Sequence, residues 1–494
     1  MKIFFRFDYN EIIGSGHLFR CLTIIKGLKK NNEIFIISRA NSIEKKLIEQ
    51  KLKKEVKKIF FFKPENKIKK KNYRSWLRTS QIKDSVETSN ILKKCKAGNN
   101  DVIIVDHYGI HNIWIKQINK KIRTIFIDDF IRKNLKSDII INGNVNAKKN
   151  FYIKRRNQKI FVGSKFAIIN PMYNPKFKLS SVKKILVFFS NSDLNKFYLK
   201  IIKSLKEIKD NLQITVIGGL SNKVNNKLTT KKIRFFNYVK NFDKMILKST
   251  LCIGSCGSAY LQRLYYNIPS IVYSLSENQK PFCNILDKNK AALYLGNEQD
   301  FSSSNFKKKF YKIINDKKKL MSMSTKSKIM VDKFTLQRVL EIIKPSDKNK
   351  LKLKRAKIND INIFYNWVKD NKVVKNSVKR KKITYENHKK WFKKAISNPK
   401  IKIFVLYLNN IPVGQIRFNK RNKKYILDYS LDWFVRGRYF GQELVKMGMN
   451  KLEKKERYII EAKVRKNNLQ SKKIFENLNF KYKLKNEFII FKYV

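Results

Sequence analysis

Apolar positions in the first 150 residues alternate between short continuous runs and longer segments with helical spacing. The runs at residues 3–7, 33–37, 101–105, 123–127 and 138–141 are rich in β-branched and aromatic side chains, a composition typical of strands. Segments with apolar residues three or four positions apart separate the runs. The alternation predicts a parallel sheet covered by helices. Functional side chains are then expected beyond the carboxyl ends of the strands.

The same alternation resumes further along the chain. Residues 151–180 are irregular and contain Pro171 and Pro175, which predicts a connection between two domains. Strand-like runs follow at residues 184–189, 213–218, 251–255 and 269–273. The pattern predicts an α/β domain over residues 1–150, a connection over 151–180 and a second α/β domain over 181–343.

A polar link at residues 344–350 precedes a third unit over residues 351–494. Its strongest signal is a strand-like run at 425–434 that leads into Val435-Arg436-Gly437-Arg438-Tyr439-Phe440-Gly441-Gln442 and then into a helical pattern at 443–452. Backbone amides at a helix start, with two arginines beside them, suit an anion. A further strand is expected at residues 458–464.

The segment Ile13-Gly14-Ser15-Gly16-His17 lies between the first strand and a helical pattern that begins at Leu18. Gly14 and Gly16 lack Cβ atoms, so a ligand can approach the backbone closely, and the amides of a first helical turn suit an anion such as a pyrophosphate. A histidine at this position can move a proton at neutral pH. The plain alternative is a histidine at the start of an ordinary helix.

Two acidic groups follow neighbouring strands of the first domain. Asp106-His107-Tyr108-Gly109 comes after the run at 101–105, and Asp128-Asp129 comes after the run at 123–127. Both groups are expected at the same edge of the sheet. Each could also cap the helix that follows it, and capping is the prediction for Asp128 and Asp129.

The composition excludes a disordered chain, because 43% of the 494 residues are apolar and 13% are aromatic. The 112 Lys and Arg residues against 37 Asp and Glu give a net charge of +75, which suits nucleic acid or an anionic membrane surface. The excess is spread through every segment instead of being gathered in one patch. We therefore expect anionic small molecules as partners, such as nucleotide sugars and coenzyme A, and no specific nucleic acid.

Cysteine spacing and the amino-terminal sequence bear on metal content and location. Neither the cysteines nor any other ligand cluster has the spacing of a metal site, so no metal is predicted. The cysteines are expected to be free buried thiols of a reducing compartment: Cys21, Cys95, Cys252, Cys256 and Cys283. The sequence has no signal-peptide pattern and no apolar run of membrane-spanning length. It predicts a cytoplasmic protein without a transmembrane segment.

Residues 1–300 resemble the UDP-sugar hydrolases of pseudaminic acid biosynthesis, which are similar to glycosyltransferases of the GT-B fold. The resemblance rests on ordered motifs: Gly14-x-Gly16-His17-x-x-Arg20-Cys21, Asp106-His107-Tyr108, Asp138-Ile-Ile-Ile-Asn142, Gly163-Ser164-Lys165-Phe166-Ala167, Ser192-Asp193, Gly257-Ser258 and Asn278-Gln279. It implies two Rossmann-like domains that face a cleft, and hydrolysis of a UDP-2,4-diacetamido-2,4,6-trideoxy sugar. It also implies that His17 is the catalytic group that handles the attacking water.

The same resemblance implies a set of substrate-binding residues: Gly14, Gly16, Arg20, Asp106, Tyr108, Gly257, Ser258, Gln262, Asn278 and Gln279. This chain departs from the family pattern at four places, one of which is Cys256-Gly257-Ser258-Ala259 in place of Gly-Gly-Ser-Thr. Gln262 stands where an acidic residue is expected to hold the ribose hydroxyls, Asn170 replaces a common arginine, and Ser190-Asn191-Ser192-Asp193 replaces Gly-Gly-Ser-Asp. The substrate sugar can therefore differ from that of the family.

Residues 351–494 resemble the GNAT acetyltransferases, which implies an α/β domain with a mixed sheet and acetyl-CoA as co-substrate. Residues implied to bind acetyl-CoA are Val435, Arg436, Gly437, Arg438, Gly441, Gln442, Asn468 and Ser471. Tyr439 replaces the first glycine of the family's pyrophosphate loop. Phe475 stands where a tyrosine often donates a proton to the departing thiolate. Trp367 and His388 match the substrate region of amino-sugar acetyltransferases, and Trp367 and Trp391 can equally be core residues.

The two resemblances imply a bifunctional enzyme that acetylates a UDP-linked amino sugar and then hydrolyses the product. One alternative is a GT-B glycosyltransferase, or a hydrolase that acts on a different UDP-sugar. UDP release without an added acceptor would separate hydrolysis from glycosyl transfer. An alternative from another class is a basic nucleic-acid or membrane-surface protein, for which salt-sensitive DNA binding would be the sign.

Overall fold

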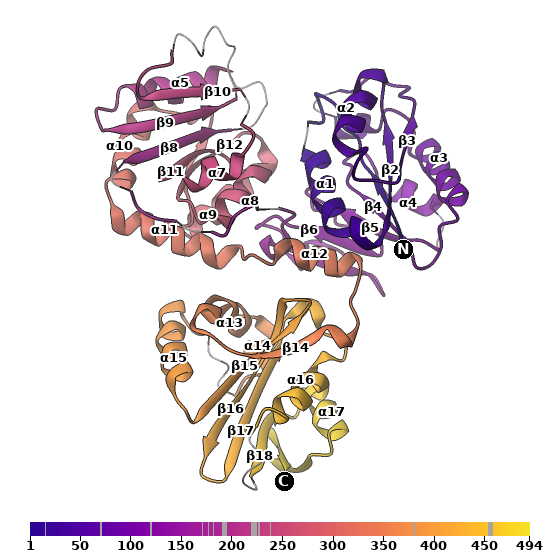
Figure 1. The fold of residues 1–494 in the computed structure, drawn as a ribbon, viewed down its shortest axis with the longest axis vertical. Coiled ribbons are helices and arrows are strands. Elements are labelled where there is room, and N and C mark those ends of the chain that lie inside the picture. The colour runs from indigo at the N-terminus through magenta and orange to yellow at the C-terminus, as the bar shows by residue number, and fades with distance from the viewer. Residues whose placement is uncertain are drawn as a thin grey trace. The chain divides into compact units, whose positions relative to one another are not determined.

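The computed structural model describes residues 1–494 apart from residues 15, 70–71, 119–120, 170, 176, 181, 190–194, 219–224, 226–227, 238, 379, 381 and 453–457. The chain divides into two compact units, residues 1–344 and 345–494. The first unit contains two parallel sheets and the second contains one mixed sheet (Figure 1). The predicted fold class, two Rossmann-like domains followed by a mixed-sheet α/β domain, is confirmed.

The first sheet has seven parallel strands in the order β3-β2-β1-β4-β5-β6-β7. The strands are β1 (Lys2–Arg6), β2 (Glu33–Arg39), β3 (Lys58–Phe62), β4 (Val102–Val105), β5 (Arg123–Ile127), β6 (Ile139–Asn142) and β7 (Lys159–Val162). Helices α1 (Gly16–Leu28) and α2 (Ser42–Leu52) lie on one face, and α3 (Gln81–Lys94) and α4 (Asn112–Gln117) on the other (Figure 1). The order reverses between β1 and β4, which is where such sheets bind ligands.

The second sheet has six parallel strands in the order β10-β9-β8-β11-β12-β13. They are β8 (Lys183–Phe188), β9 (Leu212–Ile217), β10 (Ile233–Phe236), β11 (Leu251–Ser255), β12 (Ser270–Ser274) and β13 (Leu293–Asn297). One face packs on α5 (Asn195–Lys206), α10 (Ser303–Ile314) and α11 (Lys317–Met330). The other packs on α7 (Phe242–Leu247), α8 (Ser258–Tyr265) and α9 (Lys280–Lys288). The order reverses between β8 and β11.

Two segments differ from the predicted domain boundaries. β7 lies within residues 151–180, where only an irregular connection was expected, and it extends the first sheet beyond residue 150. Helix α12 (Thr335–Ile343) follows the second sheet but packs on the first domain. Leu340 fills the space beside Gly27 of α1, and the Arg123 guanidinium donates to the carbonyl of Ile343. The chain therefore returns to its first domain before the second unit begins.

The second unit is built on a seven-stranded sheet in the order β14-β15-β16-β17-β18-β20-β19. Its strands are β14 (Leu351–Arg355), β15 (Ile401–Leu408), β16 (Ile411–Arg421), β17 (Lys424–Leu431), β18 (Ile459–Arg465), β19 (Lys481–Lys485) and β20 (Phe488–Tyr493). Among these described strands, β17 and β18 pair in parallel and the other neighbours pair antiparallel. Helices α13 (Ile361–Val368), α14 (Asn371–Asn376) and α15 (Tyr385–Ser397) precede β15, and α16 (Phe440–Met449) and α17 (Leu469–Asn477) flank β18 in the chain. Figure 1 shows α13 and α15 on the opposite side of this sheet from α16 and α17.

Candidate active sites

The loop after β1 places His17 at the start of α1. The side chain of Asn10 accepts two backbone N–H groups of this loop at 3.0 and 2.8 Å and closes a turn. Gly14 follows with φ +79°, a conformation in which a side chain would be strained. His17 is the second residue of α1 and is 4% exposed. Among the described residues, only chain neighbours come within 4 Å of where a Cβ of Gly14 or Gly16 would lie, so the backbone of the turn is open to approach.

His17 contacts the carboxylate that follows the neighbouring strand. Its Nδ1 lies 2.7 Å from Oδ1 of Asp106, which comes directly after β4. The two residues thus meet where the order of the first sheet reverses. With the Nδ1 hydrogen directed at Asp106, Nε2 of His17 carries the lone pair. A histidine held in this way can take a proton from a water molecule at Nε2.

Arg20, one turn further along α1, holds the same carboxylate. Its Nε and Nη2 donate to the two oxygens of Asp106 at 2.7 and 2.5 Å, and its Nη1 donates to Asp129 at 2.7 Å. Burial would raise the pKa of Asp106, but the charge of Arg20 and the bond to His17 outweigh it and hold that pKa well below its usual range. Asp106 is therefore an anion at neutral pH and fixes the orientation of His17. A contact of Arg20 with substrate stays a prediction.

Asp129, after β5, completes this cluster, a role that the sequence did not predict. It accepts the Tyr108 hydroxyl at 2.7 Å and the Asn144 side-chain amide at 3.3 Å, besides Arg20. The prediction that Asp128 and Asp129 cap a helix is wrong, because strand β6 is the next element of the chain. Asp128 instead accepts backbone N–H groups of the turn that follows it. The signal for Asp129 was its place at the end of the strand beside the one that carries Asp106.

His107 anchors the turn that carries Asp106. The Gly109 N–H donates to His107 Nδ1 at 3.0 Å, so Nε2 carries the hydrogen and donates it to Asp8 Oδ2 at 3.1 Å. The other oxygen of Asp8 accepts from Arg6 at 2.5 Å, and both Asp8 and Arg6 are fully buried. Burial lowers the pKa of His107, in keeping with a neutral ring. The turn after β4 is thus bonded to Asp8, which follows β1 and is itself held by Arg6 of that strand.

A buried ion cluster continues from this point. Arg6 donates to both oxygens of Asp84 at 3.0 and 2.6 Å, and Arg39 Nη2 and Trp114 Nε1 donate to the same carboxylate at 3.0 and 2.9 Å. All four of these side chains are fully buried. The cluster ties β1, β2, α3 and α4 together beneath the His17 site. Pairs as distant in sequence as Arg6 and Asp84 leave no spacing signal.

Aromatic rings stand beside His17. The Tyr108 ring meets the His17 ring edge-on, with centroids 4.5 Å apart. Phe130, Tyr73 and Trp76 lie around Tyr108 with ring centroids at 4.4, 5.7 and 5.6 Å. Tyr73 is 38% exposed. Aromatic faces near polar groups suit a ligand with a carbon-rich face, such as a pyranose ring.

In the second domain, the turn between β11 and α8 lies close to Gln279. A Cβ on Gly257 would lie 4.0 Å from the Gln279 side-chain nitrogen, and the Gln279 side-chain oxygen accepts the N–H of Leu275 at 3.1 Å. The predicted site residues Ser258 and Asn278 belong to the same two segments, but their side chains are outside the described part of the structure. Asn170 and residues 190–193 also lie outside the described residues.

Gln262 lies beside an acidic residue. Its side-chain nitrogen is 3.4 Å from Oδ1 of Asp243 in α7. Asp243 is 6% exposed, and its other oxygen accepts the N–H of Met172 at 3.2 Å. Burial raises the pKa of Asp243. A carboxylate is therefore present next to position 262, although it comes from another helix.

A disulfide links the two segments predicted to bind the nucleotide. Cys256, directly before Gly257, is bonded to Cys283 in α9, which follows Gln279. The prediction that all five cysteines are free thiols is therefore wrong for these two, and their separation of 27 residues carried no recognisable pattern. The thiols that remain free are Cys21, Cys95 and Cys252.

In the second unit, β17 and β18 diverge at one end. They pair over residues 424–427 and 459–462, whereas β17 continues to Leu431 and β18 to Arg465. The two parallel strands thus open into a wedge. The segment 435–442, predicted to hold an anion, begins close to the end of β17 and leads into α16.

Two left-handed residues shape this segment. Gly437 has φ +83° and Tyr439 has φ +61°, and α16 begins at Phe440, three residues before the predicted start. Gly441 and Gln442 therefore belong to the first helical turn. A Cβ on Gly441 would lie 2.6 Å from Ile474 Cδ1, so this glycine allows α16 to pack closely on α17. The unpaired amides of the first turn suit an anion.

The arginines of the segment are held at its two sides. Arg436 donates to the carbonyl of Leu431 at 2.9 Å and to Asp370 Oδ1 at 3.0 Å. Arg438 donates to the carbonyl of Ser346 at 2.8 Å and lies over the Phe440 ring. Val435 is fully buried. Contacts of these residues with coenzyme A stay predictions.

Trp367 and His388 are both buried in the second unit. Trp367 Nε1 donates to Asp432 Oδ2 at 2.9 Å, which bonds α13 to the turn after β17. His388 is 1% exposed, and its Nε2 lies 3.1 Å from the Ile361 carbonyl. Burial lowers the pKa of His388. Trp391 is 38% exposed and lies beneath the Arg417 guanidinium.

The predicted coenzyme A residues Asn468 and Ser471 form the start of α17. The Asn468 side-chain oxygen accepts the Ser471 N–H at 3.4 Å, and its nitrogen donates to Ser471 Oγ at 3.0 Å. Ser471 Oγ also lies 2.9 Å from the hydroxyl of Tyr429 on β17. Phe475, one turn further, is 1% exposed and packs against Phe480 and Phe491.

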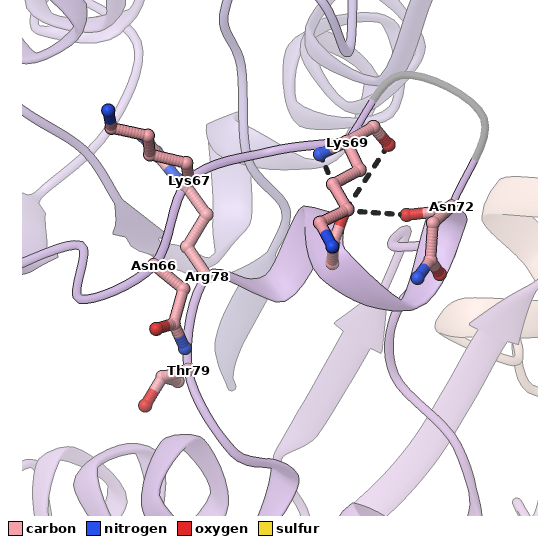
Figure 2. Close-up of a pocket in the computed structure, with 7 residues that line it drawn as sticks. Asn66, Lys67, Lys69, Asn72, Arg78 and Thr79 are labelled. Atoms are coloured by element: carbon pink, nitrogen blue, oxygen red, sulfur yellow. Dashed lines mark hydrogen bonds between the residues drawn. The ribbon is translucent and has the colours of Figure 1, made fainter.

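Other features of the described residues lie outside these two candidate sites. A shallow pocket of about 410 Å³ lies beside the short helix at Tyr73–Leu77, with Lys67 and Lys69 at its sides (Figure 2). The residues that the structure describes contain no group of three or more His, Cys, Asp or Glu placed to hold a metal ion. None of the described helices combines the length and apolar character that crossing a membrane requires.

Two family models match the chain, one in each unit, and one curated relative matches along nearly its whole length. Residues 350–481 match the model of the acetyltransferase (GNAT) domain, and residues 190–340 match that of the glycosyltransferase family 28 C-terminal domain. An uncharacterized protein of Methanocaldococcus jannaschii is 24% identical over 506 residues, with 97% of each chain covered.

Solved structures resemble one unit or the other. MurG of Acinetobacter baumannii is 12% identical, with a TM-score of 0.52 that covers 70% of this chain and 99% of that one. The RimL ribosomal-protein acetyltransferase, solved with coenzyme A, is 16% identical, with a TM-score of 0.27 and coverage of 30% and 96%. The family matches and the MurG likeness show a GT-B-like fold followed by a domain that is similar to GNAT acetyltransferases.

Proposed function

We propose that this chain is a bifunctional nucleotide-sugar enzyme of the cytoplasm that belongs to pseudaminic acid biosynthesis. Its second unit transfers an acetyl group from acetyl-CoA to the 4-amino group of a UDP-linked 4-amino-4,6-dideoxy sugar. Its first unit hydrolyses the resulting UDP-2,4-diacetamido-2,4,6-trideoxy sugar to UDP and the free sugar. The product of one site is the substrate of the other, which gives the fusion a chemical reason.

The observation that carries the hydrolase proposal is the contact between His17 Nδ1 and Asp106 at the switch point of the first sheet. In the proposed step, a water oxygen bonds to the anomeric carbon while the bond from that carbon to the UDP oxygen breaks. His17 Nε2 accepts the proton of the water, and UDP leaves with the bonding electrons. The Asp106 carboxylate balances the charge of the imidazolium that forms.

The leaving diphosphate is proposed to lie at the turn before α8. Amides at the start of this helix attract an anion, and Gln279 lies beside Gly257. Gln262, with Asp243 next to it, would meet the ribose hydroxyls. The aromatic rings around Tyr108 would receive the carbon-rich face of the sugar.

The acetyltransferase proposal is supported by the family match over residues 350–481 together with the wedge between β17 and β18. The pyrophosphate of acetyl-CoA would bind the amides of residues 436–441. Backbone amides near residues 431–434 would hold the carbonyl oxygen as the sugar amine attacks. Only the neutral amine can attack the carbonyl carbon. The nitrogen then loses one proton to water or to a base as the amide forms.

A glycosyltransferase is the second candidate, and the match to the glycosyltransferase family 28 C-terminal domain favours it. The same nucleotide-sugar site would then serve an acceptor hydroxyl in place of water. His17 would have the same task, because either nucleophile must lose a proton.

UDP release from the diacetamido UDP-sugar by the whole protein tests the proposal. We expect release without any acceptor and a fall of about 100-fold or more in His17→Ala, the usual weight of a positioned base. His111→Ala is the matched control and should keep full activity, since His111 stands outside the cluster at the start of α4. UDP release that requires an added sugar acceptor would contradict the hydrolase proposal and favour the glycosyltransferase.

A further inference from the structure

Transfer of an acetyl group from a thioester leaves a thiolate that must receive a proton. Phe475 cannot supply one, because its side chain has no acidic hydrogen and packs among Phe480 and Phe491 in the core. The proton donor of the second unit is therefore missing from the residues predicted so far. The inference below identifies one and rests on the proposed acetyltransferase function.

Tyr429 has the right place for this task. It lies on β17 beyond residue 427, where β17 has parted from β18, so its backbone stands in the wedge. Its hydroxyl lies 2.9 Å from Ser471 Oγ at the start of α17. Its ring contacts the Phe475 ring edge-on, with centroids 5.9 Å apart. A phenol hydroxyl thus stands close to Phe475, on the strand that borders the wedge.

We propose that Tyr429 is the catalytic acid of the acetyltransferase and protonates the coenzyme A sulfur as acetyl transfer occurs. The amine nitrogen bonds to the carbonyl carbon, the bond from that carbon to sulfur breaks, and sulfur keeps the electron pair. The Tyr429 O–H proton moves to sulfur. The nitrogen gives up one proton to water, and the tyrosinate takes a proton back from water, so the products are the amide and free coenzyme A.

The neighbouring hydrogen bonds fit this role. Asn468 donates to Ser471 Oγ, which allows the Ser471 hydroxyl to donate to Tyr429 and leaves the Tyr429 proton available. The same donation stabilises the tyrosinate once its proton has moved. Burial raises the pKa of Tyr429 to about 12, so the phenol is fully protonated before each transfer.

Tyr429→Phe removes only the hydroxyl, and its effect depends on the leaving group if the proposal is right. With acetyl-CoA as donor we expect kcat to fall about 100-fold, with KM for acetyl-CoA within about threefold of the wild type. With the selenium analogue of acetyl-CoA, whose selenolate leaves without a proton, the fall should shrink to less than about fivefold. Tyr425→Phe is the matched control on the same strand and should match the wild type with both donors.

Equal losses with the two donors, or a loss below about fivefold with acetyl-CoA, would overturn the assignment of Tyr429. Thermal unfolding of both variants checks that the fold is intact. Failure of the proposed function would give a different result, because the wild type itself would then transfer no acetyl group to the UDP-linked amino sugar. In that case the same comparison is made on the slow transfer of acetyl to water, measured as free thiol or selenol, because the same bond breaks.

Discussion

Tyr439 is strained at the position where the GNAT pattern has glycine. Its φ of +61° is left-handed. Because its side chain is 78% exposed, packing contacts add little to the stability of the folded state. The left-handed conformation costs about 1–2 kcal/mol for a residue with a Cβ, whereas glycine costs about 0.5–1 kcal/mol in chain entropy. We expect Tyr439→Gly to stabilise the second unit by about 0.5 kcal/mol. Urea unfolding measures it, and Gly437→Ala, at φ +83°, should shift stability the opposite way.

Two histidines of the first unit make its stability depend on pH. Burial lowers the pKa of His107, and burial followed by the charge of Arg132 lowers that of His111 to about 4. Between about pH 6.5, where an unfolded histidine titrates, and pH 4, the unfolded chain binds more protons than the folded one. Their contribution to stability is therefore present above pH 6.5 and is lost as the pH falls.

Thermal unfolding at pH 7, 6 and 5 measures this dependence. We expect the midpoint of the first unit to fall with pH and the fall to be smaller in His111→Gln, which cannot take up the proton. His111 serves better than His107 for this test because its side chain makes no bond to Asp8. An unchanged slope in His111→Gln would show that other groups set the pH dependence.

At the scale of elements, His107 bonds the turn after β4 to Asp8, which follows β1. His107→Phe keeps most of the ring volume but leaves both the Asp8 carboxylate and the Gly109 N–H without this partner. Unpaired buried polar groups cost about 1–3 kcal/mol each, so we expect a loss of about 2–4 kcal/mol in urea unfolding. His107→Asn retains an acceptor for Gly109 and should lose less. Equal losses in the two variants would contradict the role given to Nδ1.

The strands predicted from apolar runs lie within about two residues of their predicted positions, apart from the end of β17, which comes at Leu431 and not at 434. β3 (Lys58–Phe62) was not predicted, although residues 59–62 are all apolar. β5 spans Arg123–Ile127 as expected, because a buried parallel strand needs an unbroken apolar run. The start of α16 was placed three residues late, since the left-handed residue before it is a tyrosine and not a glycine. β7 was missed because it is four residues long and lies in a segment that the prolines marked as irregular.

The candidate site was predictable as far as its residues stand at strand ends. His17 and Asp106 follow neighbouring strands, and the sheet order brings them together. Asp129 was predicted at the correct edge of the sheet but was assigned to helix capping, and its bonds to Arg20 and Tyr108 were not predicted. The bond between Asp8 and His107 was not predictable, because the two residues are brought together only by the fold. The bond between Cys256 and Cys283 likewise joins positions with no common motif.

At the scale of the whole molecule, the chain consists of two units, and the described strands of each sheet all belong to one unit. The boundary lies at residue 344, although the sequence placed the start of the last domain at 351. Residues 345–350 belong with the second unit. The Ser346 carbonyl accepts a hydrogen bond from Arg438 at 2.8 Å, and the Ser346 hydroxyl accepts one from Asn409 at 2.6 Å. Lys348 adds an ion pair with Glu443 at 3.8 Å.

Two fragments of the second unit test this boundary and the independence of the units together. Residues 345–494 should fold alone and transfer acetyl groups at the rate of the whole chain, while residues 1–344 alone should release UDP. Residues 351–494 lack the bonds to Ser346 and Lys348, which are half-exposed and therefore worth on the order of 1–2 kcal/mol in total. Urea unfolding of the two fragments compares them directly. If 345–494 is no more stable than 351–494, these bonds do not stabilise the second unit. If either activity needs the whole chain, its site draws on both units.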